Sequence, residues 1–242
     1  MRTEGIYQFA DHTFSVKTLY DFTHKESINY AVSADSEADA VIQTTEADIA
    51  REDSNMEELL NFSPDSAYLE FLAVQRKVTE ALLSRDTILF HASALSVDGQ
   101  GYLFTALSGT GKSTHAALWR KQFGERVTMI NDDKPFIRIG ENEARVYGSP
   151  WDGKHHLSTN TSVPIKAIVI LTRDTTNHIE RITADDAFPI LYQQTQRFPG
   201  MERQLKVLDL LKALTERVAL YRLGCNMDPE AAIVSYEGMN HD

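Results

Sequence analysis

The sequence predicts an α/β protein with a mixed sheet, preceded by a small α+β N-terminal part. Three observations support this class. Short alternating segments before residue 65 are typical of half-buried strands, hairpin patterns follow after residue 86, and a glycine-rich turn then joins an apolar strand to a helix. Hairpins beside a strand–turn–helix unit favour a mixed sheet over a regularly alternating parallel one. We expect a strand-rich region with an acidic stretch over residues 1–65 and a larger domain over residues 66–242.

Each expected element has its own local reason. In the N-terminal part, the alternating segments 13–20 and 28–34 predict strands, and apolar residues at helical spacing predict an amphipathic helix over 66–85. Asp98 and Gly99 predict a tight hairpin turn between strands at 87–97 and 100–106. A helix at 112–123 follows, and the short apolar runs that come next predict strands at 126–131, 135–140, 143–148 and 164–173. We expect the last fifty or so residues to be mostly helical, with a final helix that Asp228 caps and Pro229 begins.

Composition limits the classes of protein and partner. The 242 residues are 42% hydrophobic, which is enough for a sizeable core. No apolar run approaches the roughly 20 residues of a membrane span, and the first residues lack the apolar centre of a secretory signal. A single cysteine, Cys225, can form no internal disulfide, as is typical of a reducing compartment. We therefore expect a cytoplasmic protein without a membrane partner.

The net charge of −11 opposes the phosphate backbone of nucleic acids, so we expect no nucleic-acid partner. Much of this charge lies between residues 31 and 66, where the acidic side chains face only Arg51. We interpret this acidic stretch as a solvated face or loop. The alternative is a docking surface for a basic partner.

The turn after the hairpin matches a phosphate-binding loop. Residues 106–113 read A-L-S-G-T-G-K-S, which is the pattern G-x4-G-K-[ST] with alanine in the first position. Gly109 and Gly111 permit the backbone angles that turn consecutive N–H groups inward, and the following helix directs its positive end to the same place. Lys112 can reach the β and γ phosphates, and the Ser113 hydroxyl can ligate Mg²⁺. The expected nucleotide-binding residues are Ser108, Gly109, Thr110, Gly111, Lys112, Ser113 and Thr114.

Two adjacent carboxylates close the next apolar strand. Asp132 and Asp133 follow Lys112 by a helix and a short loop, so they can lie beside the phosphate loop at the carboxyl edge of the sheet. Adjacent strand residues point to opposite sides, so one carboxylate can position Mg²⁺ while the other accepts a proton from a hydroxyl. We choose Asp132 as the base and Asp133 as the metal residue, although the sequence separates them little.

Two further groups are candidates for the site. His91 lies in the strand that pairs through the hairpin with the loop-bearing strand, so it can reach the aspartates and orient or tune the base. The segment 148–158 contains Trp151, Lys154 and His155, which we interpret as contacts to an acceptor or its phosphate. A plain surface loop is the alternative. We do not expect His155 and His156 to bind a metal, because neighbouring side chains in an extended segment diverge.

The stretch from about Ile88 to Ile139 resembles the catalytic domain of the bacterial HPr kinase/phosphorylase family. His91, the phosphate loop, and Asp132 with Asp133 carry the resemblance. The loop also resembles that of ATP-dependent phosphoenolpyruvate carboxykinase, which shares the nucleotide-binding core. The resemblance implies a compact P-loop kinase fold, an aspartate that activates a serine hydroxyl and a possible homo-oligomer.

The chain departs from this family at two positions. Thr114 stands where HPr kinases usually carry glutamate, and Tyr147-Gly148 replaces their arginine-glycine segment. HPr recognition and phosphorolysis are therefore not implied.

These observations predict an Mg-ATP-dependent kinase that acts on a hydroxyl. The acceptor is either a serine of a small protein or peptide, or a small metabolite. One alternative is an ATP-binding sensor without phosphotransfer, which would need no base beside the metal residue. A carboxykinase-like enzyme is a lesser alternative, because the chain is short and shows no ligand set for a second metal and a dicarboxylate.

Overall fold

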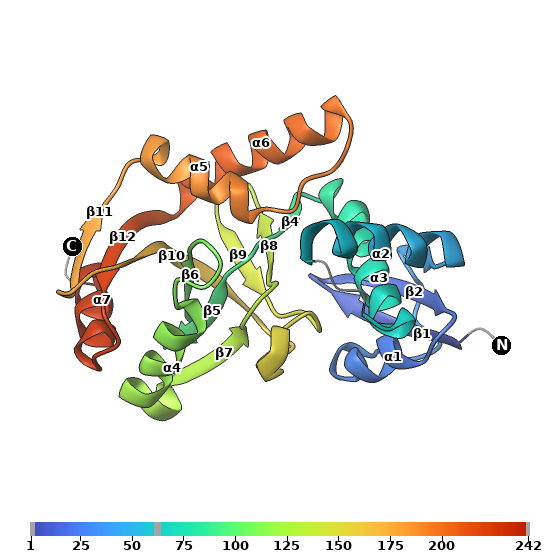
Figure 1. Ribbon diagram of the computed structural model, residues 1–242, viewed down its shortest axis with the longest axis horizontal. Coiled ribbons are helices and arrows are strands. Elements are labelled where there is room, and N and C mark those ends of the chain that lie inside the picture. The colour runs from blue at the N-terminus through green and yellow to red at the C-terminus, as the bar shows by residue number, and fades with distance from the viewer. Residues whose placement is uncertain (1–2, 61–63, 241–242) are drawn as a thin grey trace. The chain divides into compact units, whose positions relative to one another are not determined.

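A computed structural model describes residues 3–60 and 64–240, without the side chains of residues 57–60. The chain divides into two compact units, Met1–Arg85 and Asp86–Asp242 (Figure 1). The helix α3 (Ser66–Leu83) belongs to the first unit, so the units divide later in the chain than the expected boundary after residue 65. Which segments fold as independent domains stays a prediction.

A small sheet with helices forms the first unit. Strands β1 (Thr3–Phe9) and β2 (His12–Thr18) make an antiparallel hairpin, and β3 (Ala40–Gln43) pairs with β2 in parallel. Positive φ angles at Ala10 and Asp11, 49° and 63°, give the tight turn that matches the twist of the two strands. The helices α1 (Phe22–Glu26), α2 (Glu46–Leu60) and α3 complete the unit.

The strand expected at 28–34 is wrong. Residues Ile28–Tyr30 form a 3₁₀ turn, in which Tyr30 is buried against Phe9 with the ring centroids 5.7 Å apart. Ile28, by contrast, is 66% exposed. The pattern of apolar and polar residues in this segment therefore belongs to a turn, which so short a pattern does not distinguish from a strand.

Part of the acidic stretch is neutralised inside the first unit. Glu52 and Asp48 of α2 accept from Arg76 of α3 at 2.6 and 3.2 Å, and Asp48 also pairs with Lys77 at 2.8 Å. These carboxylates bind α2 to α3 and are not available as a docking surface. The remaining acidic side chains leave both interpretations of the stretch open.

The described part of the second unit contains one curled, mixed nine-stranded sheet. Strands β7, β5, β6, β10, β12 and β11 follow one another across one part of it, and β10 also pairs with β9, which continues through β8 to β4. The bounds of these strands are β4 (Thr87–Leu89), β5 (Ser93–Val97), β6 (Gln100–Thr105), β7 (Val127–Asn131), β8 (Phe136–Ile139), β9 (Ala144–Tyr147), β10 (Ser162–Arg173), β11 (His178–Arg181) and β12 (Ala219–Cys225). The mixed α/β class is thereby confirmed.

Strand direction determines which chain segments meet at one edge of the sheet. Strands β6, β10 and β12 are parallel, and β7 runs in the same direction because both β6 and β7 are antiparallel to β5. The carboxyl ends of β6, β7, β10 and β12 therefore lie at one edge, together with the start of β5. The functional candidates of the sequence cluster at this edge.

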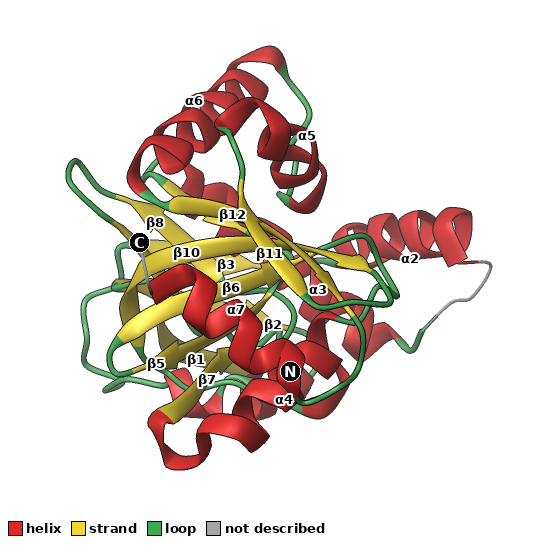
Figure 2. Cartoon of the chain, turned by 90° about the vertical axis from the view of Figure 1, so that its left-hand side faces the viewer, coloured by secondary structure: helices red, strands yellow, loops and turns green. Residues whose placement is uncertain are grey.

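Helices cover both faces of the sheet (Figure 2). The helices α4 (Lys112–Phe123) and α7 (Glu230–Asn240) lie on one face, and α5 (Ala184–Gln194) and α6 (Met201–Arg217) lie on the other. Trp119 of α4 is fully buried in the core beneath α4 and α7, against Phe104 and Tyr102 of β6. This packing anchors the helix that follows the phosphate loop. None of the helices in the described residues is long and apolar enough to cross a membrane.

Most expected elements of the second unit are confirmed. The helix at 112–123 is α4, and the hairpin turn has φ angles of 51° at Asp98 and 79° at Gly99. Two expectations were incomplete. The strand expected at 87–97 is interrupted around His91, and the C-terminal segment is not only helical, because β12 lies in the sheet beside β10. The pattern of β12 is short, and its pairing with β10 is a long-range contact that no local pattern reveals.

Candidate active site

The phosphate loop follows β6 at the edge of the sheet where the carboxyl ends of β6, β7, β10 and β12 lie. Gly109 and Gly111 have φ angles of 75° and 122°, a backbone conformation that side chains disfavour. A β-carbon added at Gly109 would meet nothing within 4 Å, so strain and not crowding explains this glycine. Helix α4 begins directly after Gly111 and has no side-chain cap, so its first backbone N–H groups face the loop without a side-chain partner. This geometry suits an anion.

Lys112 is held inside the loop. Its side chain is buried, with the residue 9% exposed, and its Nζ donates to the carbonyl oxygen of Ala106 at 3.2 Å. Burial lowers the pKa of Lys112, and the charge of Lys134 lowers it further, while Asp133 and Asp132 act in the opposite direction. The phosphate-loop lysine and the paired aspartates therefore lie within electrostatic reach of one another.

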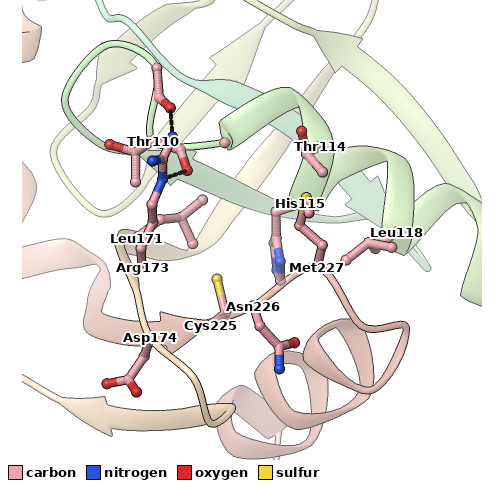
Figure 3. A pocket seen from close by; sticks show the side chains of 12 residues that line it. Thr110, Thr114, His115, Leu118, Leu171, Arg173, Asp174, Cys225, Asn226 and Met227 are labelled. Atoms are coloured by element: carbon pink, nitrogen blue, oxygen red, sulfur yellow. Dashed lines mark hydrogen bonds between the residues drawn. The ribbon is translucent and has the colours of Figure 1, made fainter.

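Arg173 at the end of β10 fixes the loop from the other side. Its guanidinium donates to the carbonyl oxygens of Gly109 and Thr110 (Figure 3). Because β10 and β6 are parallel neighbours, the carboxyl end of β10 lies beside the start of the loop. The two hydrogen bonds point carbonyl groups toward Arg173, which favours an orientation of the loop amides away from it.

A turn held by the Asn131 side chain fixes the backbone at the paired aspartates. Asn131, the fully buried last residue of β7, accepts from the backbone N–H groups of Asp133 and Lys134 at 2.8 and 2.7 Å. Its amide nitrogen donates to the carbonyl oxygen and the hydroxyl of Ser149 at 3.0 and 3.1 Å. This Asx turn stops the strand and fixes the direction of both carboxylates.

The two carboxylates have different surroundings. Asp132 is buried and accepts from the Ser93 hydroxyl at 2.6 Å. Asp133 pairs with His91 Nε2 at 3.1 Å and with Lys134 Nζ at 3.0 Å. Burial raises the pKa of Asp133, but the hydrogen bond from His91 and the charge of Lys134 outweigh it and hold the pKa below its ordinary value of 3.8. Asp133 is therefore firmly ionised at neutral pH.

The break between β4 and β5 places His91 against Asp133. The backbone N–H of His91 donates to Gln194 at 2.8 Å, and its carbonyl oxygen accepts from the Thr105 hydroxyl at 2.9 Å. The next residue, Ala92, donates to the carbonyl oxygen of Asp133 at 3.2 Å. His91 does reach the paired aspartates, but it contacts Asp133, whereas our choice for the base is Asp132.

The segment 148–158 lies against the paired aspartates, but its three candidate residues differ. Gly153 approaches Asp133 so closely that an added β-carbon would lie 3.1 Å from the Asp133 Cβ. Trp151 is 3% exposed and packs edge-on against Phe136, so its ring is a core group. Lys154 and His155 are exposed beside the site and are free to face an acceptor.

The residues present fit a nucleoside triphosphate with Mg²⁺. The loop offers a glycine-lined cradle, a buried ammonium and, at Ser113, a half-buried hydroxyl at the start of α4. Within residues 3–60 and 64–240, no cluster of three or more His, Cys, Asp or Glu side chains offers a complete metal site. Magnesium in such sites takes one or two protein oxygens and the substrate phosphates, a demand that Ser113 and one aspartate meet.

Three side chains of the site were not among the residues expected from the sequence. Ser93 and Lys134 contact the paired aspartates, and Arg173 holds the loop. Lys134 directly follows the aspartates, so its position could have been noticed. Ser93 and Arg173 reach the site only through strand pairing, which the sequence does not display.

Comparison with known proteins adds a distant structural likeness. No family model and no curated protein matches the chain. Among solved structures, the chain is similar to the Hpr(Ser) kinase/phosphatase from Coxiella burnetii, with a TM-score of 0.36 and 11% identity. The match covers 63% of this chain and 95% of that one. Because a likeness at this level carries no argument about activity, we argue the function from the geometry of the site.

Proposed function

We propose that the protein is an Mg-ATP-dependent phosphotransferase that acts on a hydroxyl group. The observation that carries the proposal is the position of two carboxylates, Asp132 and Asp133, within electrostatic reach of Lys112 in a phosphate-type loop. A site that only binds a nucleotide needs the loop and one metal-positioning carboxylate. A second, buried carboxylate at the same edge suits proton removal from an acceptor.

Four groups hold the phosphates and the metal in this proposal. The loop amides around Gly109 and Gly111 and the Lys112 ammonium bind the phosphate oxygens, and Ser113 with Asp133 supplies oxygen ligands for Mg²⁺. Bound Mg²⁺ supplies positive charge against the phosphates during transfer. Asp133 suits the metal because its depressed pKa keeps it ionised, and its ion pair with Lys134 marks a place where positive charge is stabilised.

Asp132 is the proposed base. Its carboxylate is held by a neutral hydroxyl, that of Ser93, and not by an ion pair such as those of Asp133. A proton from an incoming hydroxyl is therefore accepted by a group whose charge is not already matched by an adjacent cation. Lys134, whose charge also acts on Lys112, adds positive charge where the phosphoryl group moves.

The proposed acceptor is a serine of a small protein or peptide, or a small metabolite. It approaches from the β7 side, where the segment 148–158 lies beside Asp133 and exposes Lys154 and His155. These two side chains offer positive charge or hydrogen bonds to an acceptor. Their use in recognition is part of the proposal.

Incubation with Mg²⁺ and γ-labelled ATP, with and without lysate from the protein's own source, tests the proposal. Wild-type protein should transfer label to a lysate component, and Lys112→Ala, Asp132→Asn and Asp133→Asn should each lower the rate by about a hundredfold or more. Asp132→Asn should leave ATP affinity within about threefold of the wild type, because the base is not a phosphate ligand. Asp209→Asn, an exposed position on α6, is the matched control and should transfer label at the wild-type rate.

Tight ATP binding with no transferred label, unchanged by either aspartate variant, would contradict the proposal. It would favour the sensor alternative. The part of the acidic stretch outside the ion pairs between α2 and α3 would then be the first surface to test for a partner.

A further inference from the structure

A cavity of about 480 Å³ lies beside the phosphate loop (Figure 3). It is bordered by the first turns of α4, the end of β10 and the loop between β12 and α7. The phosphate loop itself forms one wall through Gly109, Thr110 and Gly111. Its volume falls in the ordinary range for small-molecule sites.

Apolar side chains from three elements line this cavity. Leu118 comes from α4, Leu171 from β10, and Met227 from the loop after β12. Met227 is 77% exposed, so its side chain is available to pack on a ligand. Unbranched methionine adapts to flat, polarisable ligands. This lining suits the faces of an aromatic ring.

His115 adds a polar group to the same wall. Its ring is buried, and burial lowers its pKa to about 4, so it is neutral near pH 7. Its Nε2 lies 3.2 Å from the Ser235 hydroxyl and accepts from Trp119 at 3.1 Å, while Nδ1 has no partner among the described residues. A ligand with polar ring-edge groups can supply the missing partner. A purely apolar ligand cannot.

The order of the strands indicates which end of a bound nucleotide would face the cavity. Strand β6, which leads into the phosphate loop, lies between β10 on one side and β5 with β7 on the other. The cavity is on the β10 and β12 side, whereas Asp132 and Asp133 follow β7. A linear triphosphate bound across the loop therefore directs its last phosphate to the aspartates and its nucleoside end to the cavity.

We propose that this cavity binds the purine base of a nucleoside triphosphate whose phosphates lie on the loop. The assignment of the phosphates rests on the proposed function. A second cavity of about 330 Å³ borders the loop on the α5 side and is less suitable. Arg173 and one aspartate line each cavity, but the second adds the charge of Arg222 and has neither the exposed methionine nor the buried histidine of the first. A base without charge gains little there, and its desolvation would leave charged groups unpaired.

Calorimetric titration of ATP and of inorganic triphosphate, both with Mg²⁺, tests the cavity. Met227→Ala should weaken ATP about fivefold by removing apolar contact, and should change the affinity for inorganic triphosphate less than twofold. Met201→Ala, at a methionine of similar exposure (72%) on α6 outside the cavity, is the matched control and should change neither affinity. Equal losses for both ligands, or no loss for ATP, would overturn the proposal.

The chain's one cysteine provides a second readout. Cys225 lines the cavity and is partly exposed, so a small disulfide reagent such as 4,4′-dithiodipyridine reports on its occupancy. Burial raises the pKa of the Cys225 thiol, so the reaction is best followed at mildly alkaline pH. ATP and adenosine should each slow the reaction at least threefold, and inorganic triphosphate should not. Reaction at the same rate with and without saturating ATP would overturn the proposal.

The two experiments separate this inference from the proposed function. Triphosphate binding that Lys112→Ala abolishes, with no added affinity from adenosine, would refute the base site and leave the phosphate loop intact. Protection of Cys225 by adenosine, with no binding of triphosphate, would support the base site and contradict the proposed kinase.

Discussion

His115 shows what one buried side chain contributes to the fold. Its ring packs edge-on against Phe104 with the centroids 4.5 Å apart, and its nitrogen joins Trp119 and Ser235 in a buried polar network. The Ser235 hydroxyl links this network to the backbone of α7, because it donates to the carbonyl oxygen of Ala231 at 2.8 Å. One polar cluster thus fixes α4, which carries the phosphate loop, against α7.

This histidine predicts an acid sensitivity of the fold. Its pKa falls from 6.5 to about 4 on burial, so between these pH values the unfolded chain binds the proton and the folded chain does not. The free energy of unfolding should therefore decrease by about 1.4 kcal/mol per pH unit as the pH falls from 6.5 to 4. Above pH 6.5 the histidine is neutral in both states, so it adds no dependence of stability on pH.

Urea unfolding across this pH range measures the effect. His115→Gln should remove this part of the slope, whatever its stability at neutral pH. His155→Gln, at an exposed position, should retain the wild-type slope. Identical slopes for wild type and His115→Gln would contradict the expectation.

At the scale of elements, the phosphate loop depends on a neighbour that its motif does not include. Glycines make the loop conformation accessible, but they also leave it free to adopt others. Arg173 at the end of β10 limits this freedom by holding the Gly109 and Thr110 carbonyl groups. The parallel pairing of β6 with β10 is thus part of the candidate site.

Loss of this restraint should weaken phosphate binding. We expect Arg173→Ala to lower the affinity for Mg²⁺ and inorganic triphosphate about tenfold, as charged hydrogen bonds to the loop are lost. Arg173→Lys should recover only part of the loss, because a lysine lacks the planar fork that holds two carbonyl groups. Titration calorimetry measures both, with Arg181→Ala on the exposed edge strand β11 as a control of the same charge change. Full recovery by Arg173→Lys would indicate that charge alone matters.

On the scale of the whole molecule, every residue of the candidate site lies in one compact unit. The loop, the aspartates, His91 and Arg173 all fall within Asp86–Asp242, and the sheet that aligns them is complete in that unit. The first unit has its own sheet and its own ion pairs between α2 and α3. Phosphate binding should therefore not require residues 1–85.

Expression of residues 86–242 alone tests this division. The fragment should unfold cooperatively in urea and bind inorganic triphosphate with Mg²⁺ within about threefold of the full chain's affinity, since a domain has its own core. Lys112→Ala in the same fragment should abolish that binding. A fragment without a cooperative transition would show that the two compact units are one folding unit.

The sequence by itself determined the parts of this protein that depend on neighbouring residues. The phosphate loop, the helix at 112–123, the Asp98-Gly99 turn and the adjacent aspartates were all predictable, because glycine conformation, helical spacing and turn chemistry act over a few residues. The mixed α/β class followed from the same local patterns. The roles given to the site residues, and any relation to phosphoenolpyruvate carboxykinase, stay predictions.

Only the tertiary structure decided which distant residues meet. It placed β12 beside β10, paired His91 with Asp133 and Ser93 with Asp132, and brought Arg173 to the loop. It also buried Trp151, which the sequence had suggested as an acceptor contact. The physical reason is the same in each case: strand order and burial arise from contacts between segments far apart in the chain, and these contacts leave no periodic pattern in either segment.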